Sequence, residues 1–337
     1  LEKRRIDWFI LHTGQHYSPN LDSIFFQQLN LPQPRYNLNV GSGSHAEETG
    51  KMLIGMDAVL KKESPTDALV EGDTNIVLAG ALVSVKSGIR VGHVEAGLRS
   101  YDRNMPEEIN RVIVDHCSDL LFAPTEKTYK ILQGEGIPDD KIFITGNTIV
   151  DAVYQNAEIS RTKGNTLKIL GLEPKKYLLL TLHRQENVDN QARFTTMLST
   201  IEELATEYKL PIIYPIHPRS RKMMERFSLK VKNITLIEPL DFLGFLQIEE
   251  NARLILTDSG GVQEESCILQ VPCVTLRDNT ERPETVDVGA NLLAGADPVK
   301  IKTCARAMMQ KRTGWKNPFG DGKTAGHIID ILEGKGL

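Results

Sequence analysis

Short apolar segments rich in Val, Ile and Leu alternate along the chain with longer segments in which apolar residues recur every three or four positions. The short segments suit buried strands and the longer ones suit amphipathic helices. Because parallel strands need crossover connections, this alternation predicts parallel sheets wound with helices. We expect strands at residues 6–11, 68–71, 91–94, 120–123, 142–145, 178–182, 212–215, 234–237, 254–257 and 274–276, and helices at 47–62, 76–87, 106–116, 193–208 and 262–269.

The length of 337 residues is enough for two domains of ordinary size. The stretch 151–176 is more polar than its surroundings and leads directly into the apolar segment 178–182. We therefore predict a first domain at residues 1–160 and a second at 161–337, with the last helix packing back on the first. Both would be doubly wound α/β domains facing each other across a cleft, with ligands at the carboxyl ends of their strands.

The charge balance excludes several classes of function. The chain has 40 Lys and Arg against 44 Asp and Glu, a formal net charge of −4. Such a chain lacks the positive field that attracts nucleic acid or an anionic membrane. No apolar segment reaches the roughly 18–20 residues of a membrane helix, and the four scattered cysteines form no C-x-x-C pair. We predict a cytoplasmic protein that binds neither nucleic acid nor membrane.

The most specific local motif is an apolar segment that ends in Asp258, Ser259, Gly260 and Gly261 and opens a helix-forming segment. Ser259 is a good N-cap, and the glycines would let a phosphate approach backbone N–H groups at the positive helix end. Glu265, farther along the helix, is placed for sugar hydroxyls. The motif alone leaves two interpretations open, a phosphate site or a tight turn with solvated glutamates.

Two acidic residues follow neighbouring strands of the first expected sheet. Asp73 comes after the strand at 68–71, and Glu95 comes directly after the strand at 91–94. Parallel strands present their carboxyl ends at one edge of a sheet, so we expect the two carboxylates at the same edge. For either residue alone, a helix cap or a solvated carboxylate also explains the position.

The segment 106–116 begins with Pro106, which suits the first position of a helix. We expect its apolar face to contact the core and its other face to present Glu107 beside Arg111; a surface ion pair also explains the latter spacing. The residues of the expected core face are Ile109, Val112, Ile113 and His116.

Two histidines stand at the ends of strands in the second half. His183, followed by Arg184, ends the segment 178–182, and His217 follows the segment 212–215. Such groups suit a site that handles anions or protons near neutral pH. A solvated loop explains His217 equally well. Arg277, Glu281 and Arg282 follow the strand at 274–276 and are expected at the rim of the same cleft.

A glycine-rich match at residues 41–46 is not expected to bind a dinucleotide. That fingerprint needs a buried strand before it and an acid about 20 residues later. The preceding residues 36–40 are half polar, and the next expected strand ends farther away, at Glu71. We predict a loop there.

The motifs together, in order along nearly the whole chain, resemble those of the non-hydrolysing UDP-N-acetylglucosamine 2-epimerases. The resemblance rests on residues 71–74, 92–99, 106–111, 144–148, 258–265 and 280–284. It implies a fold of the glycosyltransferase-B type with UDP in the cleft, usually a homodimer. It also implies interconversion of UDP-N-acetylglucosamine and UDP-N-acetylmannosamine.

The family is held to eliminate UDP across C1 and C2 of the sugar, leaving 2-acetamidoglucal, and then to add UDP back. That route implies no nicotinamide and no metal cofactor. By resemblance, Asp73, Glu95 and Glu107 are the carboxylates of proton transfer and sugar orientation, and His183 stabilises the leaving diphosphate. Which carboxylate is the base in which direction stays open. The residues expected to bind the UDP-sugar are Arg111, Arg184, Leu240, Phe245, Ser259, Gly260, Gly261, Glu265 and Arg282.

Two departures from the family pattern are apparent. Relatives begin with a strand and a Gly-Thr-Arg-Pro-Glu turn that helps to hold the diphosphate, whereas this chain starts at Leu1 without it. We expect about one strand and part of a helix to precede Leu1 in the complete protein. Bacterial members also carry a second, activating UDP-N-acetylglucosamine site; Gln15, Arg184 and His217 fit it, but Lys51 and Met52 stand where those relatives place an arginine.

Three other functions are compatible with these motifs. They are a glycosyltransferase of the same fold, a hydrolysing epimerase that releases N-acetylmannosamine, and a non-catalytic UDP-sugar sensor. The transferase would not need carboxylates at both Asp73 and Glu95.

Overall fold

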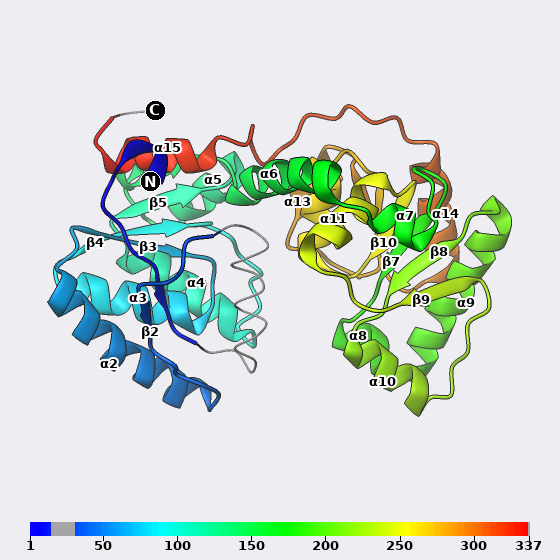
Figure 1. Cartoon of the computed structure of the whole chain (residues 1–337), viewed down its shortest axis with the longest axis horizontal. Coiled ribbons are helices and arrows are strands. Elements are labelled where there is room, and N and C mark those ends of the chain that lie inside the picture. The colour runs from blue at the N-terminus through cyan, green and yellow to red at the C-terminus, as the bar shows by residue number, and fades with distance from the viewer. Residues whose placement is uncertain (15–30, 336–337) are drawn as a thin grey trace. The chain divides into compact units, whose positions relative to one another are not determined.

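The computed structural model describes residues 1–14 and 31–335, and the chain divides into two compact units (Figure 1). Unit 1 comprises Leu1–Thr148 and Gly322–Leu337, and unit 2 comprises Ile149–Asp321. The division falls at the start of helix α6 (Thr148–Lys163) rather than at the predicted residue 160. The reason is that Val150, Val153 and Ala157 of α6 pack in a core cluster of unit 2.

Unit 1 contains a four-stranded parallel sheet in the order β3-β4-β5-β6 and a separate parallel pair, β1 with β2. Its strands are β1 (Leu11–His12), β2 (Tyr36–Asn37), β3 (Asp67–Glu71), β4 (Arg90–Val94), β5 (Leu120–Ala123) and β6 (Ile142–Ile144). Its helices are η1 (Glu2–Arg4), α2 (His45–Glu63), α3 (Asn75–Lys86), α4 (Pro106–Cys117), α5 (Glu126–Gly134), η2 (Asp139–Lys141) and α15 (Thr324–Leu332).

Neighbouring residues of the unit 1 sheet face opposite layers, as the pleat requires. Val94 and Phe122 pack against α15, whereas Leu121 packs in the cluster of α5. The last helix therefore covers one face of the sheet in unit 1. Arg4 near the N-terminus ties down this helix through an ion pair of 2.6 Å with Asp330.

Unit 2 contains one six-stranded parallel sheet. Its strands are β7 (Leu178–Thr181), β8 (Ile212–Pro215), β9 (Ile234–Ile237), β10 (Leu254–Thr257), β11 (Cys273–Thr275) and β12 (Asn291–Leu293). Its other helices are α7 (Thr166–Leu170), α8 (Gln185–Val188), α9 (Gln191–Tyr208), α10 (Pro218–Arg226), α11 (Phe242–Asn251), α12 (Gly260–Ile268), α13 (Pro283–Asp287) and α14 (Pro298–Met309).

The strand order in unit 2 is β12-β11-β10-β7-β8-β9. The chain starts in the middle of the sheet at β7, proceeds outward to β9, then returns to β10 and proceeds outward the other way. The connections after β7 and β10 therefore lead toward opposite edges of the sheet. Doubly wound sheets bind ligands at such a switch point. His183 and Arg184 follow β7, and Asp258 and Ser259 follow β10.

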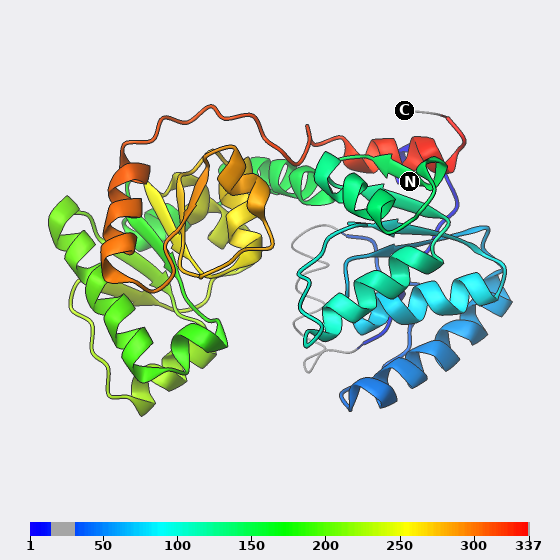
Figure 2. The same cartoon turned by 180° about the vertical axis from the view of Figure 1, so that it is seen from behind.

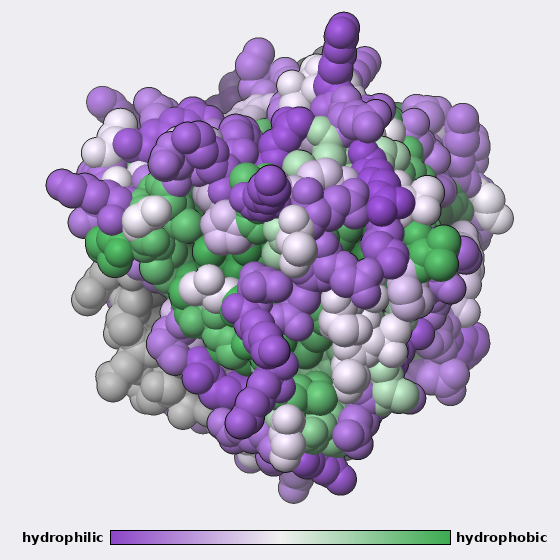
Figure 3. Space-filling view, turned by 90° about the vertical axis from the view of Figure 1, so that its right-hand side faces the viewer, coloured by the Kyte–Doolittle hydropathy of each residue, from purple (hydrophilic) through white to green (hydrophobic). Residues whose placement is uncertain are grey.

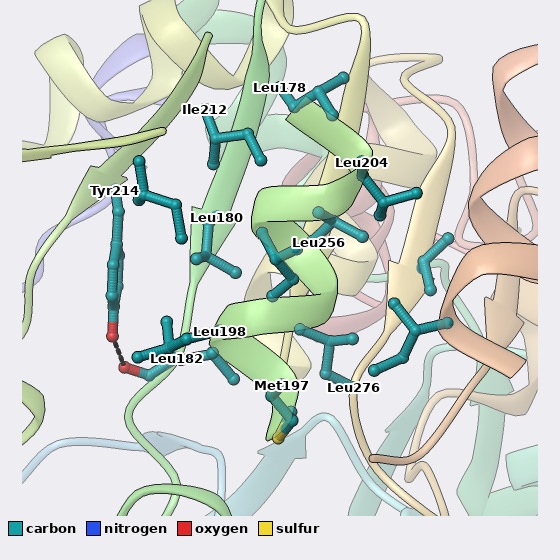
Figure 4. Packing of buried hydrophobic residues seen from close by; sticks show 14 of the residues in the cluster. Leu178, Leu180, Leu182, Met197, Leu198, Leu204, Ile212, Tyr214, Leu256 and Leu276 are labelled. Carbon is teal, nitrogen blue, oxygen red and sulfur yellow. Dashed lines mark hydrogen bonds between the residues drawn. The ribbon is translucent and has the colours of Figure 1, made fainter. Parts of the chain in front are cut away.

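The core of unit 2 lies on both faces of this sheet (Figures 1 and 2). Leu178, Leu180 and Leu182 pack with α9 and α14, while Tyr177 and Leu179 pack with α11 and α12. Figure 4 shows the first cluster, in which the buried Tyr214 hydroxyl donates a hydrogen bond of 2.6 Å to the Leu182 carbonyl. This bond fixes the backbone that leads directly into His183.

The prediction of an α/β fold with two Rossmann-like units is confirmed, but some elements differ. The strand expected at 6–11 is only Leu11–His12, where the chain pairs with β2. Neither β2 nor β12 was predicted, because two or three residues at the edge of a sheet are specified by their partner strand more than by their own pattern. Residues 41–44 form the expected loop, which ends at Ser44, the N-cap of α2.

The predicted core face of α4 is wrong. Val112 and Ile113 are 37% and 38% exposed, and His116 is exposed too. The buried residues of this helix are Glu108, Asn110, Arg111, Val114 and Asp115. Polar side chains take the inward face because each finds hydrogen-bond partners there.

Within residues 1–14 and 31–335, no helix is long and apolar enough to cross a membrane. The face of the protein seen in Figure 3 is mostly hydrophilic, with small hydrophobic areas between polar side chains. The described part of the chain also holds no cluster of three or more His, Cys, Asp or Glu side chains suited to a metal ion.

Candidate active site

The carboxyl ends of β3 and β4 bring Asp73 and Glu95 to the same edge of the unit 1 sheet. The strands are parallel, with Glu71 beside Val94. Gly72 turns the chain after β3 with a φ of +85°, and a Cβ on Gly72 would lie 3.8 Å from Glu95 Oε2. The Glu95 carboxylate therefore lies close to the backbone that leads into Asp73. This arrangement is the one that the sequence predicted.

Arg111 of α4 holds the Asp73 carboxylate from one side. Its Nη2 and Nε donate to Asp73 Oδ2 at 2.7 and 3.0 Å. The Asp73 side chain is 30% exposed, and its Oδ1 bonds to no other residue among those described. One oxygen is thus fixed and the other is open to a ligand. Arg111, which the sequence assigned to substrate binding, orients Asp73 in this structure.

Glu108 is a residue of the site that the sequence missed. Its carboxylate accepts from Arg111 Nη1 at 2.6 Å and from the backbone N–H groups of Ser100 and Tyr101 at 2.8 and 2.9 Å. Burial acts to raise the pKa of Glu108, but these hydrogen bonds outweigh burial and lower it. The i, i+3 spacing to Arg111 was the available signal. Glu107, the predicted catalytic residue, is half-buried and makes no hydrogen bond or ion pair with another described residue.

A buried polar network lies behind Glu95, and its one signal at the level of sequence is a histidine in an apolar strand. Asp115 accepts from His93 Nδ1 at 2.6 Å, from Arg99 Nη1 at 2.7 Å and from the Gly97 N–H at 3.2 Å. His93 Nε2 contacts the Gly72 carbonyl oxygen at 2.9 Å. Asp115 therefore holds the chain on both sides of Glu95, whose φ is +69°.

In unit 2, three neighbouring strands bring His183, His217 and Asp258 together, because β7 lies between β8 and β10. Asp258 is fully buried and accepts from the His183 N–H at 3.0 Å, the Arg184 N–H at 2.9 Å and Asn187 Nδ2 at 3.1 Å. Its Oδ1 also lies 3.1 Å from His183 Nδ1. The rings of His183 and His217 are 5.3 Å apart.

The turn at Ser259, Gly260 and Gly261 opens α12, as predicted. Ser259 is the N-cap residue, yet its side chain makes no cap hydrogen bond. A Cβ on Gly260 or Gly261 would meet no atom closer than 4.0 Å, so a ligand has room to approach the backbone. The N-terminus of a helix with uncapped N–H groups attracts anions such as phosphate.

Arg184 adds a cationic group at the switch point. Its side chain is half-buried, and its buried Nε has no hydrogen-bond partner among the described residues. Buried donors are normally paired, so this orphaned N–H indicates a place for an acceptor that binds from outside. The buried Nε of Arg282 likewise has no aligned hydrogen bond to a described residue, although it lies 2.7 Å from Glu264 Oε1 in an ion pair.

Arg277 and Glu281 form a clamp after β11. The two guanidinium nitrogens Nη1 and Nη2 donate to the Glu281 oxygens at 2.8 and 2.9 Å. Burial acts to raise the pKa of Glu281, but Arg277 outweighs burial and lowers it to about 2. This charge also lies near α12, since a Cβ on Gly260 would be 4.0 Å from Glu281 Oε2.

The remaining predicted contacts lie at α11 and α12. Leu240 and Phe245 pack on the cluster that contains Tyr177. Glu265 lies beside Glu249, a fully buried residue of α11. Burial and the Glu265 charge raise the pKa of Glu249 well above its usual value, and burial also raises the pKa of Glu265. Burial therefore favours the protonated form of both carboxyl groups.

The proposed second ligand site is only partly within the described structure. Gln15 lies outside the described residues. Arg184 and His217 lie at the ends of the adjacent strands β7 and β8. The activating site stays a prediction.

The comparisons with known proteins agree on one family. The chain matches the family model described as UDP-N-acetylglucosamine 2-epimerase over residues 1–333. The UDP-N-acetylglucosamine 2-epimerase of Methanocaldococcus jannaschii is 56% identical, over 98% of this chain and 93% of its own. The crystal structure of that enzyme in complex with UDP-GlcNAc and UDP matches with a TM-score of 0.87 over the same shares.

Two more distant relatives cover nearly the whole chain as well. The crystal structure of UDP-GlcNAc 2-epimerase from Neisseria meningitidis bound to UDP-GlcNAc is 32% identical, with a TM-score of 0.87 over 99% of this chain and 94% of its own. A Pseudomonas aeruginosa protein named UDP-2,3-diacetamido-2,3-dideoxy-D-glucuronate 2-epimerase is 38% identical over 98% of this chain and 93% of its own.

Because of the clamp between Arg277 and Glu281, we expect the free energy of unfolding to fall at acid pH. Since the folded-state pKa of about 2 is below the ordinary 4.5, the clamp stabilises fully above pH 4.5 and is lost as pH falls through 2. We expect Glu281→Gln to lower the free energy of unfolding by about 2 kcal/mol at pH 7. The difference from wild type should shrink as the pH falls below 4.5.

Urea unfolding at several pH values measures this difference. Glu238→Gln is the matched control, because Glu238 is 80% exposed in its ion pair with Arg221; it should change little at any pH. A Glu281→Gln deficit that stayed constant down to pH 2 would contradict the role of the clamp.

Proposed function

The chain belongs to the UDP-N-acetylglucosamine 2-epimerase family, with a glycosyltransferase-B-like fold, and from this premise we propose that it is a non-hydrolysing UDP-N-acetylglucosamine 2-epimerase. It would interconvert UDP-N-acetylglucosamine and UDP-N-acetylmannosamine. The observation that carries the proposal is the pair of carboxylates, Asp73 and Glu95, at one edge of the unit 1 sheet. A 2-epimerase must take a proton from one face of C2 and return one to the other, and carboxylates can do both.

The chemistry at C2 explains why the diphosphate must leave. The C2 proton is next to an acetamido group and is not activated by a carbonyl, so its simple removal needs a very strong base. Elimination avoids this: the C2–H electron pair forms the C1–C2 double bond while the C1–O bond breaks and UDP departs. Return of UDP to C1 and of a proton to the other face of C2 completes the inversion.

The unit 1 residues supply the groups for proton transfer. Asp73 presents Oδ1, while Arg111 fixes Oδ2 and orients the side chain. Glu95 is set by the turn that Asp115 holds. Glu107, which bonds to no other described residue, is available to the sugar hydroxyls.

The unit 2 residues supply the groups for the diphosphate. The N-terminus of α12 at Gly260 and Gly261 offers backbone donors, and Arg184 offers a cation with an unpaired Nε. His183 lies at the same switch point. Donors fixed in advance stabilise the charge that appears on UDP as the C1–O bond breaks. We propose that Glu265 binds the ribose, Leu240 and Phe245 bind the uracil, and Arg282 contacts the nucleotide.

An NMR time course in D₂O with UDP-N-acetylglucosamine as the sole substrate tests the proposed activity. We expect UDP-N-acetylmannosamine to appear with deuterium at C2, because the returning proton comes from solvent through a carboxylate. Free N-acetylmannosamine with UDP would instead show a hydrolysing epimerase. An unchanged substrate that still binds would favour a sensor or a transferase that lacks its acceptor.

The two carboxylates are tested by Asp73→Asn and Glu95→Gln. Loss of a general acid–base group should lower kcat by about 10²–10⁴-fold, while UDP affinity stays within a few fold because neither residue lies in unit 2. Asp139→Asn, an exposed aspartate of unit 1, is the matched control and should keep wild-type turnover. Full activity in both site variants would rule out their assignment.

We also propose that the protein is cytoplasmic, as its composition suggests, and that it is a homodimer, as the family resemblance implies. The exposed Val112 and Ile113 of α4 are available to a partner subunit. Light scattering coupled to size-exclusion chromatography should give twice the mass of the chain, and a monomer at all concentrations would contradict the dimer.

A further inference from the structure

Two histidines lie next to each other at the switch point of unit 2. His183 follows β7 and His217 follows the adjacent β8, and their ring centroids are 5.3 Å apart with an angle of 37° between the planes. Two positive charges at this separation repel each other. The pair therefore disfavours a state with two charged rings, and the surroundings decide which ring takes a proton first.

The ring of His183 contacts a buried carboxylate. Its Nδ1 lies 3.1 Å from Oδ1 of the fully buried Asp258. Asp258 is itself ionised: burial acts to raise its pKa, but the hydrogen bonds and the charge of His183, with the donors of Arg184 and Asn187, outweigh burial and lower it. Because Nδ1 faces a carboxylate, it carries a proton, and Nε2 is left as the ring's other polar atom. The side chain is 34% exposed, so a ligand can reach it.

The surroundings of His217 favour the neutral ring. His217 is the N-cap residue of α10, and its Nδ1 accepts the N–H of Arg219 at 3.1 Å. A protonated Nδ1 cannot accept, so charging the ring would break this helix cap. Burial, the charge of His183 and the charge of Arg219 together lower the pKa of His217, although Asp258 acts in the other direction.

The other charged groups around the pair are largely compensated. Arg219 of α10 is bound by Asp189, at 2.9 and 2.6 Å. Arg277 after β11 is bound by Glu281 and lies 3.6 Å from Glu186 of α8. Arg184 follows His183 directly in the chain, and its Nε has no hydrogen-bond partner among the described residues. Among the described residues, Asp258 is therefore the carboxylate that contacts the pair directly, through the ring of His183.

We propose that Asp258 and the capping role of His217 together place the single positive charge of the pair on His183, which makes Asp258 a positioning residue for the reaction. One part of this inference, the role of the charge toward departing UDP, rests on the proposed function. The Nε2–H of the charged His183 would donate a hydrogen bond to the diphosphate oxygens as negative charge appears on UDP. His217, held neutral, does not compete for that charge.

NMR titration of ¹³Cε1-labelled histidines in the ligand-free protein tests where the charge lies. On acidification, His183 should gain its proton before His217. Asp258→Asn should lower the pH at which His183 titrates by more than about one unit, because it removes the adjacent opposite charge. Asp189→Asn, a loss of a carboxylate that contacts neither ring, is the matched control and should leave the order unchanged. Earlier protonation of His217, or an unshifted His183 in Asp258→Asn, would overturn the proposal.

The pH dependence of kcat tests the link to catalysis. The alkaline limb for Asp258→Asn should move to lower pH by the shift measured for His183, whereas a purely structural role would lower kcat equally at all pH values. The titration needs no turnover, so an inactive wild type would contradict the proposed function and leave the charge assignment standing. Active enzyme whose alkaline limb ignores the His183 titration would overturn the positioning role.

A second variant keeps the proposal testable if Asp258→Asn fails to fold. His217→Asn retains an acceptor at the N-cap of α10, since asparagine caps helices well. If His217 is neutral in the wild type, its removal should move the His183 titration by less than about half a unit. A rise of more than about one unit would mean that His217 had carried the charge, and would overturn the proposal.

Discussion

A carboxylate buried away from water is stable only when donors surround it, and each unit of this protein builds the ends of its strands around one such group. Asp258 in unit 2 and Asp115 in unit 1 are each 0–1% exposed and bind a histidine, a backbone N–H and at least one further donor. Each therefore holds a side chain and a loop at once. The loops that carry the proposed catalytic groups are fixed by charge and hydrogen bonds, in addition to apolar packing.

Helix α4 positions proposed catalytic groups that belong to other elements. Arg111 and Asp115 are one turn apart, and they hold Asp73 and the turn of Glu95 respectively. Arg99, with a fully buried guanidinium, balances Asp115, and the nearby carboxylates raise its pKa further although burial alone would lower it. The inward face of α4 is thus polar because it positions carboxylates, and the apolar Val112 and Ile113 face outward.

The strands were the most predictable part of the fold. Leu120–Ala123, Ile212–Pro215 and Leu254–Thr257 are short, mostly apolar segments, a pattern that favours buried strands of a parallel sheet. The predicted parallel order of strands in unit 1 was enough to place Asp73 and Glu95 at the same edge of its sheet. The prediction for α4 failed because it assumed that charged residues face water and apolar residues face the core. In α4 the buried face is largely polar.

The spacing of residues in the sequence also could not decide which acidic residue of α4 forms an ion pair with Arg111. Glu107 and Glu108 are four and three positions before it, and both spacings suit an ion pair. Only the backbone donors of Ser100 and Tyr101, brought near by the preceding loop, favour Glu108. The association of His93 with Asp115, 22 positions apart, likewise depends on the packing of α4 against β4.

The return of the last helix to unit 1 has a consequence for the order in which the protein is made. Unit 2 is continuous, whereas unit 1 includes residues from both ends of the chain. Domains generally fold as the ribosome releases them, yet Val94 and Phe122 cannot be covered by Ile328 and Ile331 until the segment that follows unit 2 has been made. The apolar face of the first sheet therefore lacks this cover during the whole synthesis of unit 2, and apolar surface exposed during folding favours aggregation.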